Sequence, residues 1–235
     1  MNRLIAIQKI IDKIQAQIYV EIGVRDAAVI NKVNAPFKYG IDPFFSLSGI
    51  DSLKKIFHLL NFKAMDITSD SFFAEKLPAR IKKEGIDVIF VDGLHTYNQA
   101  LTDVENSLKY LNENGFIIMH DCNPVSALSA FPIKESFSEI EDYIKKEKIE
   151  GWNWNWNGDV WKALVHLRIM HDDLQIFTIN ADWGLGIIKK GPSEKLNKLT
   201  VEELKIADYS LLENNRIELL NLREPSFFDD IINSL

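Results

Sequence analysis

The stretch IDVIFVDGLHTYNQALTDVENSLKYLNENGFIIMHD, residues 86–121, contains a strand–helix–strand pattern. The segments 86–93 and 116–121 begin with nearly continuous apolar runs, which are typical of strands buried on both faces of a parallel sheet. Between them, residues 98–115 carry apolar side chains at helical spacing, and Gly115 is a favourable helix end. This stretch therefore predicts a βαβ unit with a parallel strand pair.

The same alternation of strands and helices extends in both directions along the chain. Upstream, we expect strands at 18–24, 37–43 and 61–67, and helices at 2–16, 25–33, 52–60 and 71–85, the last with a break at Pro78. Downstream, we expect helices at 133–150, 160–170 and 201–222, a loop at 151–159 and strands at 174–180 and 184–190. The pattern predicts one α/β domain over residues 1–235, with helices on both faces of the sheet.

The composition fits a single soluble domain. The chain has 235 residues, a formal net charge of −7 and a hydrophobic content of 46%. The negative charge argues against nucleic acid as a partner, because phosphate binding normally needs a basic face. No stretch approaches the roughly 20 apolar residues that span a bilayer. The single cysteine, Cys122, excludes an internal disulfide and fits a reducing compartment, so we expect a cytoplasmic protein.

Polar side chains follow the expected strands at their carboxyl ends, where open parallel sheets bind ligands. Glu21 and Gly23 end the first strand, and the glycine allows the backbone to approach a ligand closely. A phosphate-binding loop would have several glycines and no acid. Taken alone, these two residues fit a plain turn, but Asp42 at the next strand end can bind a ribose diol. Together they favour an adenosine-type ligand whose other end is positively charged and lacks phosphate.

These motifs resemble those of the class I S-adenosylmethionine-dependent methyltransferases. The resemblance is carried by VEIGVRDAAV (20–29), GIDP (40–43) and IDVIFVDGLHTY (86–97). A narrower resemblance, to bacterial methyltransferases of sugars, surface polysaccharides and macrolide glycosides, is carried by TSDSFF (68–73), residues 91–124 and WNGDVWKALVHLR (156–168). The class implies a Rossmann-like, three-layer αβα fold. Its seven-stranded sheet is mostly parallel, with an antiparallel last strand in the hairpin near 174–189.

The resemblance implies S-adenosyl-L-methionine as cofactor, bound by a core at 18–124. The implied contacts are Glu21 and Gly23 at the methionine portion, Asp42 at the ribose, Asp66, Ser69 and Asp70 at the adenine, and Asp92. The remaining parts are an N-terminal helix (1–17), an acceptor side (125–173), and the last strands with a helical tail (174–235). Ala27 departs from the class, which usually has glycine at that position.

The fourth and fifth strand ends carry the expected chemistry. Asp92 and Asp121 offer hard oxygen ligands for Mg²⁺ or Mn²⁺, and His120 is a candidate third ligand. Related metal-dependent sugar methyltransferases use an Asp-Gly-x-His motif to supply a ligand and a base, and Asp92 and His95 match it. Those relatives place two acids at the next strand end, where this chain has His120 and Asp121. Simpler roles stay open: His95 as a helix cap, and His120 as a hydrogen-bonding partner of a loop.

The acceptor is expected to be a carbohydrate, such as a nucleotide sugar or a surface-glycan precursor. Because indoles stack on sugar rings and amides and acids bind hydroxyls, we expect Tyr97, Trp154, Asn157 and Asp159 to contact it. A plug over the core is the alternative for this tryptophan-rich loop. The expected reaction is methyl transfer to a hydroxyl oxygen with His95 as base. Transfer to an amine or a phosphate-type oxygen, and a non-catalytic cofactor-binding or assembly protein, stay open, and a homo-oligomer is compatible with the sequence.

Overall fold

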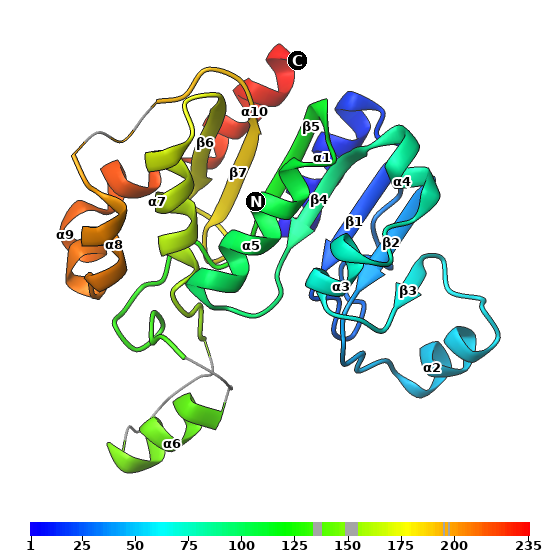
Figure 1. The fold of residues 1–235 in the computed structure, drawn as a ribbon, viewed down its shortest axis with the longest axis horizontal. Coiled ribbons are helices and arrows are strands. Elements are labelled where there is room, and N and C mark those ends of the chain that lie inside the picture. Colours follow the sequence, from blue (N-terminus) through cyan, green and yellow to red (C-terminus); the bar gives the residue numbers. More distant parts are fainter. Residues whose placement is uncertain (134–137, 149–154, 195, 197) are drawn as a thin grey trace.

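The computed structural model describes residues 1–133, 138–148, 155–194, 196 and 198–235. Within these residues the strands form one sheet in the order β3-β2-β1-β4-β5-β7-β6-β8 (Figure 1). The strands are β1 (Ile18–Ile22), β2 (Phe37–Ile41), β3 (Lys63–Met65), β4 (Ile86–Val91), β5 (Leu111–Met119), β6 (Leu174–Ile179), β7 (Leu185–Lys190) and β8 (Leu222–Arg223). All neighbouring pairs are parallel except those that involve β7, which runs antiparallel to β5 and β6. The expected antiparallel strand in the last hairpin is therefore confirmed.

Helices cover both faces of this sheet, which confirms the three-layer architecture. They are α1 (Arg3–Ile14), α2 (Gly49–Ile56), α3 (Ser69–Ala74), α4 (Ala79–Glu84), α5 (Tyr97–Leu108), α6 (Ser138–Lys146), α7 (Val160–Met170), α8 (Val201–Ile206), α9 (Tyr209–Leu220) and α10 (Pro225–Ser234). Successive side chains of a strand point to opposite faces, and Ile89 and Phe90 of β4 accordingly join two separate buried clusters. α1 and α10 cover the Phe90 face, and α5 and α7 cover the Ile89 face (Figure 1).

The sheet has eight strands in the described residues, whereas seven were expected. The additional strand, β8, lies in the segment predicted as a helical tail. Asn221 adopts a left-handed conformation with φ 45° and ends α9. Leu222 and Arg223 then pair with Thr178 and Ile179 at the edge of the sheet.

Two predicted helices differ from the structure. Residues 25–33 form turns rather than a helix. Arg25 and Ala27 have φ of 51° and 61°, in the left-handed region. Glycine adopts this conformation most easily, which fits the glycine that the resembled class usually has at position 27. The helix expected at 98–115 ends at Leu108, because Leu111 already pairs with Ile86 at the start of β5.

The structure confirms the break expected in the helix at 71–85. The helical segment around Pro78 is broken, since α3 ends at Ala74 and α4 begins at Ala79. No helix in the described part of the chain is long and apolar enough to cross a membrane.

Candidate active site

The carboxyl ends of β1, β4 and β5 meet at one edge of the sheet, because these parallel strands are neighbours. At this edge Gly23 adopts φ 85°, and a Cβ atom there would lie 2.0 Å from the carbonyl oxygen of Asp92. The glycine therefore allows the turn after β1 to lie directly against the end of β4. The sequence predicted that Gly23 lets the backbone approach a ligand, and in the structure the close neighbour of Gly23 is the backbone of Asp92, just after β4.

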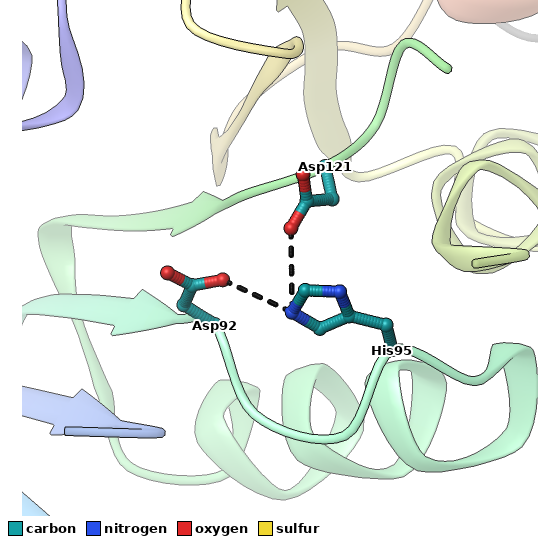
Figure 2. A group of neighbouring side chains, drawn as sticks. All are labelled: Asp92, His95 and Asp121. Carbon is teal, nitrogen blue, oxygen red and sulfur yellow. Dashed lines mark ion pairs between the residues drawn. The ribbon is translucent and has the colours of Figure 1, made fainter. Parts of the chain in front are cut away.

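Three side chains from this edge converge, as Figure 2 shows. The Nε2 atom of His95 lies 3.4 Å from Oδ1 of Asp92 and 3.3 Å from Oδ2 of Asp121. One ligand atom from each residue lies within 4.8 Å of the other two, a spacing compatible with a shared metal ion. Asp92 follows β4, Asp121 follows β5, and His95 lies in the connection between β4 and α5. We predicted from the sequence that polar residues at neighbouring carboxyl strand ends lie together, and these three residues do.

His120 approaches the same two acids from the buried side. Its Nδ1 lies 2.8 Å from Oδ2 of Asp121 and 3.2 Å from Oδ1 of Asp92, and its side chain is 4% exposed. Its Nε2 is buried without a hydrogen-bond partner in the described residues, and Oδ1 of Asp182 lies 3.8 Å away. Two imidazoles thus flank one pair of carboxylate oxygens.

Arg3 and Asp182 complete this polar cluster, and neither was predicted. The Arg3 guanidinium donates to Oδ2 of Asp92 at 3.0 Å and to both oxygens of Asp182 at 3.0 and 3.1 Å. Arg3 begins α1, and Asp182 lies in the turn between β6 and β7. Because β6 is parallel to β4 and β5, Asp182 follows another carboxyl end at the same edge. Arg3 carries no comparable signal in the sequence.

Opposite charges set the protonation of this cluster. Burial opposes ionisation of Asp92, but His120 and His95 outweigh it and hold the pKa of Asp92 well below its usual range. Burial also opposes protonation of His95, yet Asp121 and Asp92 raise its pKa. The same balance against burial raises the pKa of His120, with Asp92 as the largest favourable partner. The imidazoles therefore favour protonation and supply positive charge between the acids.

Glu21 lies on β1 and is 2% exposed. The Tyr19 hydroxyl donates to Oε2 of Glu21 at 2.6 Å. Burial raises the pKa of Glu21 to about 8, despite this hydrogen bond. Near neutral pH the carboxyl group is therefore largely protonated.

We expect Glu21→Gln to change how stability depends on pH. The folded-state pKa of Glu21 is raised to about 8. The contribution of Glu21 to the free energy of unfolding is therefore fully present below the ordinary glutamate pKa and is lost as pH rises through the folded-state pKa. Glutamine does not titrate, so the variant should gain on the order of 3 kcal/mol over wild type between pH 5 and pH 8. Denaturant unfolding at both pH values measures this difference, and parallel curves for the two proteins would refute the raised pKa.

Asp42 follows β2 and is largely buried. Its Oδ2 accepts from the amide of Arg25 and its Oδ1 from the amide of Phe44, each at 2.7 Å. The carboxylate thus connects the turn after β1 with the turn after β2. Each oxygen keeps a second lone pair, so these bonds leave room for hydroxyl donors.

The three residues expected near the adenine have other partners in the structure. Asp66 is exposed and pairs with Nζ of Lys55 at 2.5 Å. The Ser69 hydroxyl donates to buried Asp103 at 2.6 Å, and Asp70 accepts a long bond of 3.4 Å from the Gln99 amide. Ser69 and Asp103 therefore join α3 to α5.

The residues expected at the acceptor lie beside the cluster or outside the described part. Asn157 donates to Oδ1 of Asp121 at 2.7 Å, and Oδ1 of Asp159 accepts from the Tyr97 amide at 2.6 Å. The Tyr97 hydroxyl lies 2.5 Å from Nδ1 of His166, between α5 and α7. Trp154 lies outside the described residues.

Part of the chain is similar to a known protein family. Residues 39–122 match a family described as a methyltransferase domain. The match begins in β2 and ends just after Asp121, so it includes Asp42, Asp92 and His95. The chain is therefore similar to this methyltransferase family over residues 39–122 of its 235.

Solved structures share this fold at low sequence identity. A candidate caffeoyl-CoA O-methyltransferase from Staphylococcus aureus has a TM-score of 0.53 and 16% identity, with 81% of this chain and 85% of that chain covered. The SAH-bound methyltransferase PaMTH1 from Podospora anserina has a TM-score of 0.52 and 15% identity, with 81% and 79% covered. Cofactor-bound Rv0187 from MTB has a TM-score of 0.53 and 10% identity, with 82% of both chains covered. These likenesses confirm the Rossmann-like methyltransferase fold.

One curated relative is similar over part of the chain. The uncharacterized protein R132 of Acanthamoeba polyphaga mimivirus is 30% identical over 111 residues, which cover 44% of this chain and 50% of that protein. The match thus spans about half the length of the relative.

Proposed function

We propose that this protein is an S-adenosylmethionine-dependent O-methyltransferase whose acceptor is a hydroxyl group, assisted by a divalent cation. The convergence of Asp92, His95 and Asp121 at the carboxyl edge of the sheet carries this proposal. The SAH-bound and cofactor-bound structures with the same fold support the choice of cofactor. Glu21, Gly23 and Asp42 would hold its methionine and ribose portions, with Asp92 beside them.

The residues of the cluster suit a cation chemically. Asp92 and Asp121 supply hard oxygen ligands, and an imidazole nitrogen extends the fit from Mg²⁺ to Mn²⁺. In an octahedral site with bonds of about 2.1 Å, neighbouring ligand atoms are roughly 3 Å apart. The distances of 3.3 and 3.4 Å from His95 Nε2 to the two acids are close to that spacing. A bound cation would supply charge that lowers the pKa of the acceptor hydroxyl.

Proton removal is the chemical task of the protein itself. When a hydroxyl oxygen takes the methyl group, its oxygen–hydrogen bond must break, and the cofactor keeps the electron pair of the broken sulfur–carbon bond. His95 is the proposed base. A cation held by Asp92 and Asp121 would offset the negative charge that favours a protonated His95, and would so leave one of its nitrogens able to accept a proton. The spacing of the three ligand atoms supports a second role for His95, as the third cation ligand in place of His120.

The acceptor proposed here is a sugar, a nucleotide sugar or a surface-glycan precursor. Support comes from the sequence motifs and from the Trp156 indole, which lies stacked beside His95 with ring centroids 5.2 Å apart. An aromatic face next to the reacting groups suits a sugar ring. Loss of turnover in excess chelator would separate a hydroxyl acceptor from an amine, which needs little help from a cation.

Asp42→Ala should weaken the cofactor and leave the acceptor largely unaffected. Losing the hydrogen bonds that ribose hydroxyls would donate to a charged carboxylate costs about 1.5–3 kcal/mol, or roughly 10–100-fold in affinity. Calorimetric titration with S-adenosylmethionine measures this change. Asp42→Asn is the control, because it keeps one acceptor for the Arg25 or Phe44 amide. An unchanged cofactor affinity combined with a raised acceptor KM would move the ribose away from Asp42.

A further inference from the structure

We propose that Trp156, Asn157, Gly158 and Asp159, here called the 156–159 clamp, position His95 and Asp121. The four consecutive residues each contact this part of the site, one after another. They form the connection into α7, just before Val160. This inference rests on the proposed function, because it concerns how the site presents His95 and Asp121.

The Trp156 carbonyl determines which nitrogen of His95 is free. It lies 3.2 Å from Nδ1 of His95, and a carbonyl oxygen can only accept. Nδ1 must therefore carry a hydrogen to make this bond, so Nε2 is the nitrogen that offers a lone pair when the imidazole is neutral. Nε2 is the atom that faces Asp92 and Asp121. The Trp156 indole stacks on the imidazole at an interplanar angle of 24° and holds the plane of the ring.

Asn157 fixes the orientation of the Asp121 carboxylate. It is 1% exposed, and its amide donates to Oδ1 of Asp121 at 2.7 Å. An ionised carboxylate only accepts, so this bond fixes the Asn157 amide with its nitrogen toward Asp121. Oδ2 of Asp121 remains directed at His95.

Gly158 and Asp159 hold the backbone that carries His95. Gly158 has φ 64°, and a Cβ atom there would lie 1.9 Å from the carbonyl oxygen of His95. Only glycine allows this close approach without displacement of one segment. Asp159 accepts from the Tyr97 amide at 2.6 Å, at the first residue of α5.

The 156–159 clamp is itself fixed from the other side. The carbonyl of Ser129 accepts from the amides of Asn157 and Gly158 at 2.8 and 3.0 Å. The carbonyl of Phe131 accepts from the Trp156 indole at 2.7 Å. The segment therefore connects the loop at 129–131 to the site and can hold His95 rigidly. Supporting partners of this kind typically change metal affinity or activity by 10–100-fold when they are lost.

Nitrogen-15 NMR of the histidine side chains tests this inference without any acceptor. In the wild-type protein we expect Nδ1 of His95 to carry a proton both before and after Mg²⁺ is added, while the signal of Nε2 changes with Mg²⁺. An Nδ1 that is unprotonated in either state would overturn the role of the Trp156 carbonyl.

Calorimetric Mn²⁺ titration of two variants tests the clamp itself. Asn157→Ala and Gly158→Ala should each weaken Mn²⁺ binding by about 10–100-fold. Gly49→Ala is the matched control, because no atom lies within 4 Å of a Cβ added there. If Gly158→Ala does not fold, Asn157→Ala decides, and wild-type affinity in that variant overturns the proposal.

These outcomes separate the clamp from the proposed function. If the wild-type protein binds neither Mg²⁺ nor Mn²⁺, the cation-assisted function fails, while a protonated Nδ1 still supports the positioning by Trp156. If the wild-type protein binds Mn²⁺ and the Asn157→Ala variant binds it equally well, the function stands and the clamp is wrong.

Discussion

Asp92→Asn should abolish tight cation binding and lower turnover by at least about 100-fold. The change removes one of the two ionised carboxylates while it keeps the shape of the side chain. It also leaves Arg3 paired with Asp182, so the surrounding structure should survive. A buried cation left with a single acid is poorly compensated, because desolvation of a divalent ion demands close opposite charge.

Calorimetric Mn²⁺ titration and steady-state methyl transfer measure the two effects of Asp92→Asn. Asp12→Asn, on the exposed face of α1, is the matched control and should behave as wild type. Full turnover of the Asp92→Asn protein in excess chelator would end the cation hypothesis.

His95→Ala should lower turnover by about 10²–10⁴-fold, the range expected for loss of a general base. Cofactor affinity should hardly change, since none of the residues proposed to hold the methionine or ribose portion is altered. His58→Ala is the control, because that exposed histidine lies beyond the end of α2, away from the cluster.

The Mn²⁺ affinity of His95→Ala distinguishes the two roles open to this residue. A base that does not bind the cation can be removed with little effect on Mn²⁺ affinity. If His95 is instead a cation ligand, its loss should weaken Mn²⁺ binding together with turnover. Unchanged turnover would exclude both roles.

The sequence was sufficient to predict which residues lie together at the centre of the candidate site. Asp92 and Asp121 follow two apolar runs that read as neighbouring parallel strands, and parallel neighbours bring their carboxyl ends together. The same rule applies to Asp182, because β6 is parallel to β5. The sequence alone does not place Asp182 at this edge, because the direction of β6 depends on its pairing with β7.

Sequence patterns did not predict the contacts between segments that are far apart in the chain. Arg3 reaches Asp182 across 179 positions of the chain, and its residue type at the start of an amphipathic helix suggests only a solvated cation. The role of Asn157 beside Asp121 likewise depends on how α7 enters the fold. Local periodicity also failed at 25–33, where left-handed residues replace a helix that the composition allows.

Diffraction from crystals grown with S-adenosylhomocysteine and Mn²⁺, recorded at the manganese absorption edge, tests the central proposal most directly. The account predicts one anomalous peak about 2.0–2.4 Å from Oδ1 of Asp92 and Oδ2 of Asp121. It also predicts the cofactor product along the carboxyl edge of the sheet, with its ribose at Asp42. A bound cofactor product with no manganese between Asp92 and Asp121, or a peak located elsewhere, would contradict cation-assisted methyl transfer at this site.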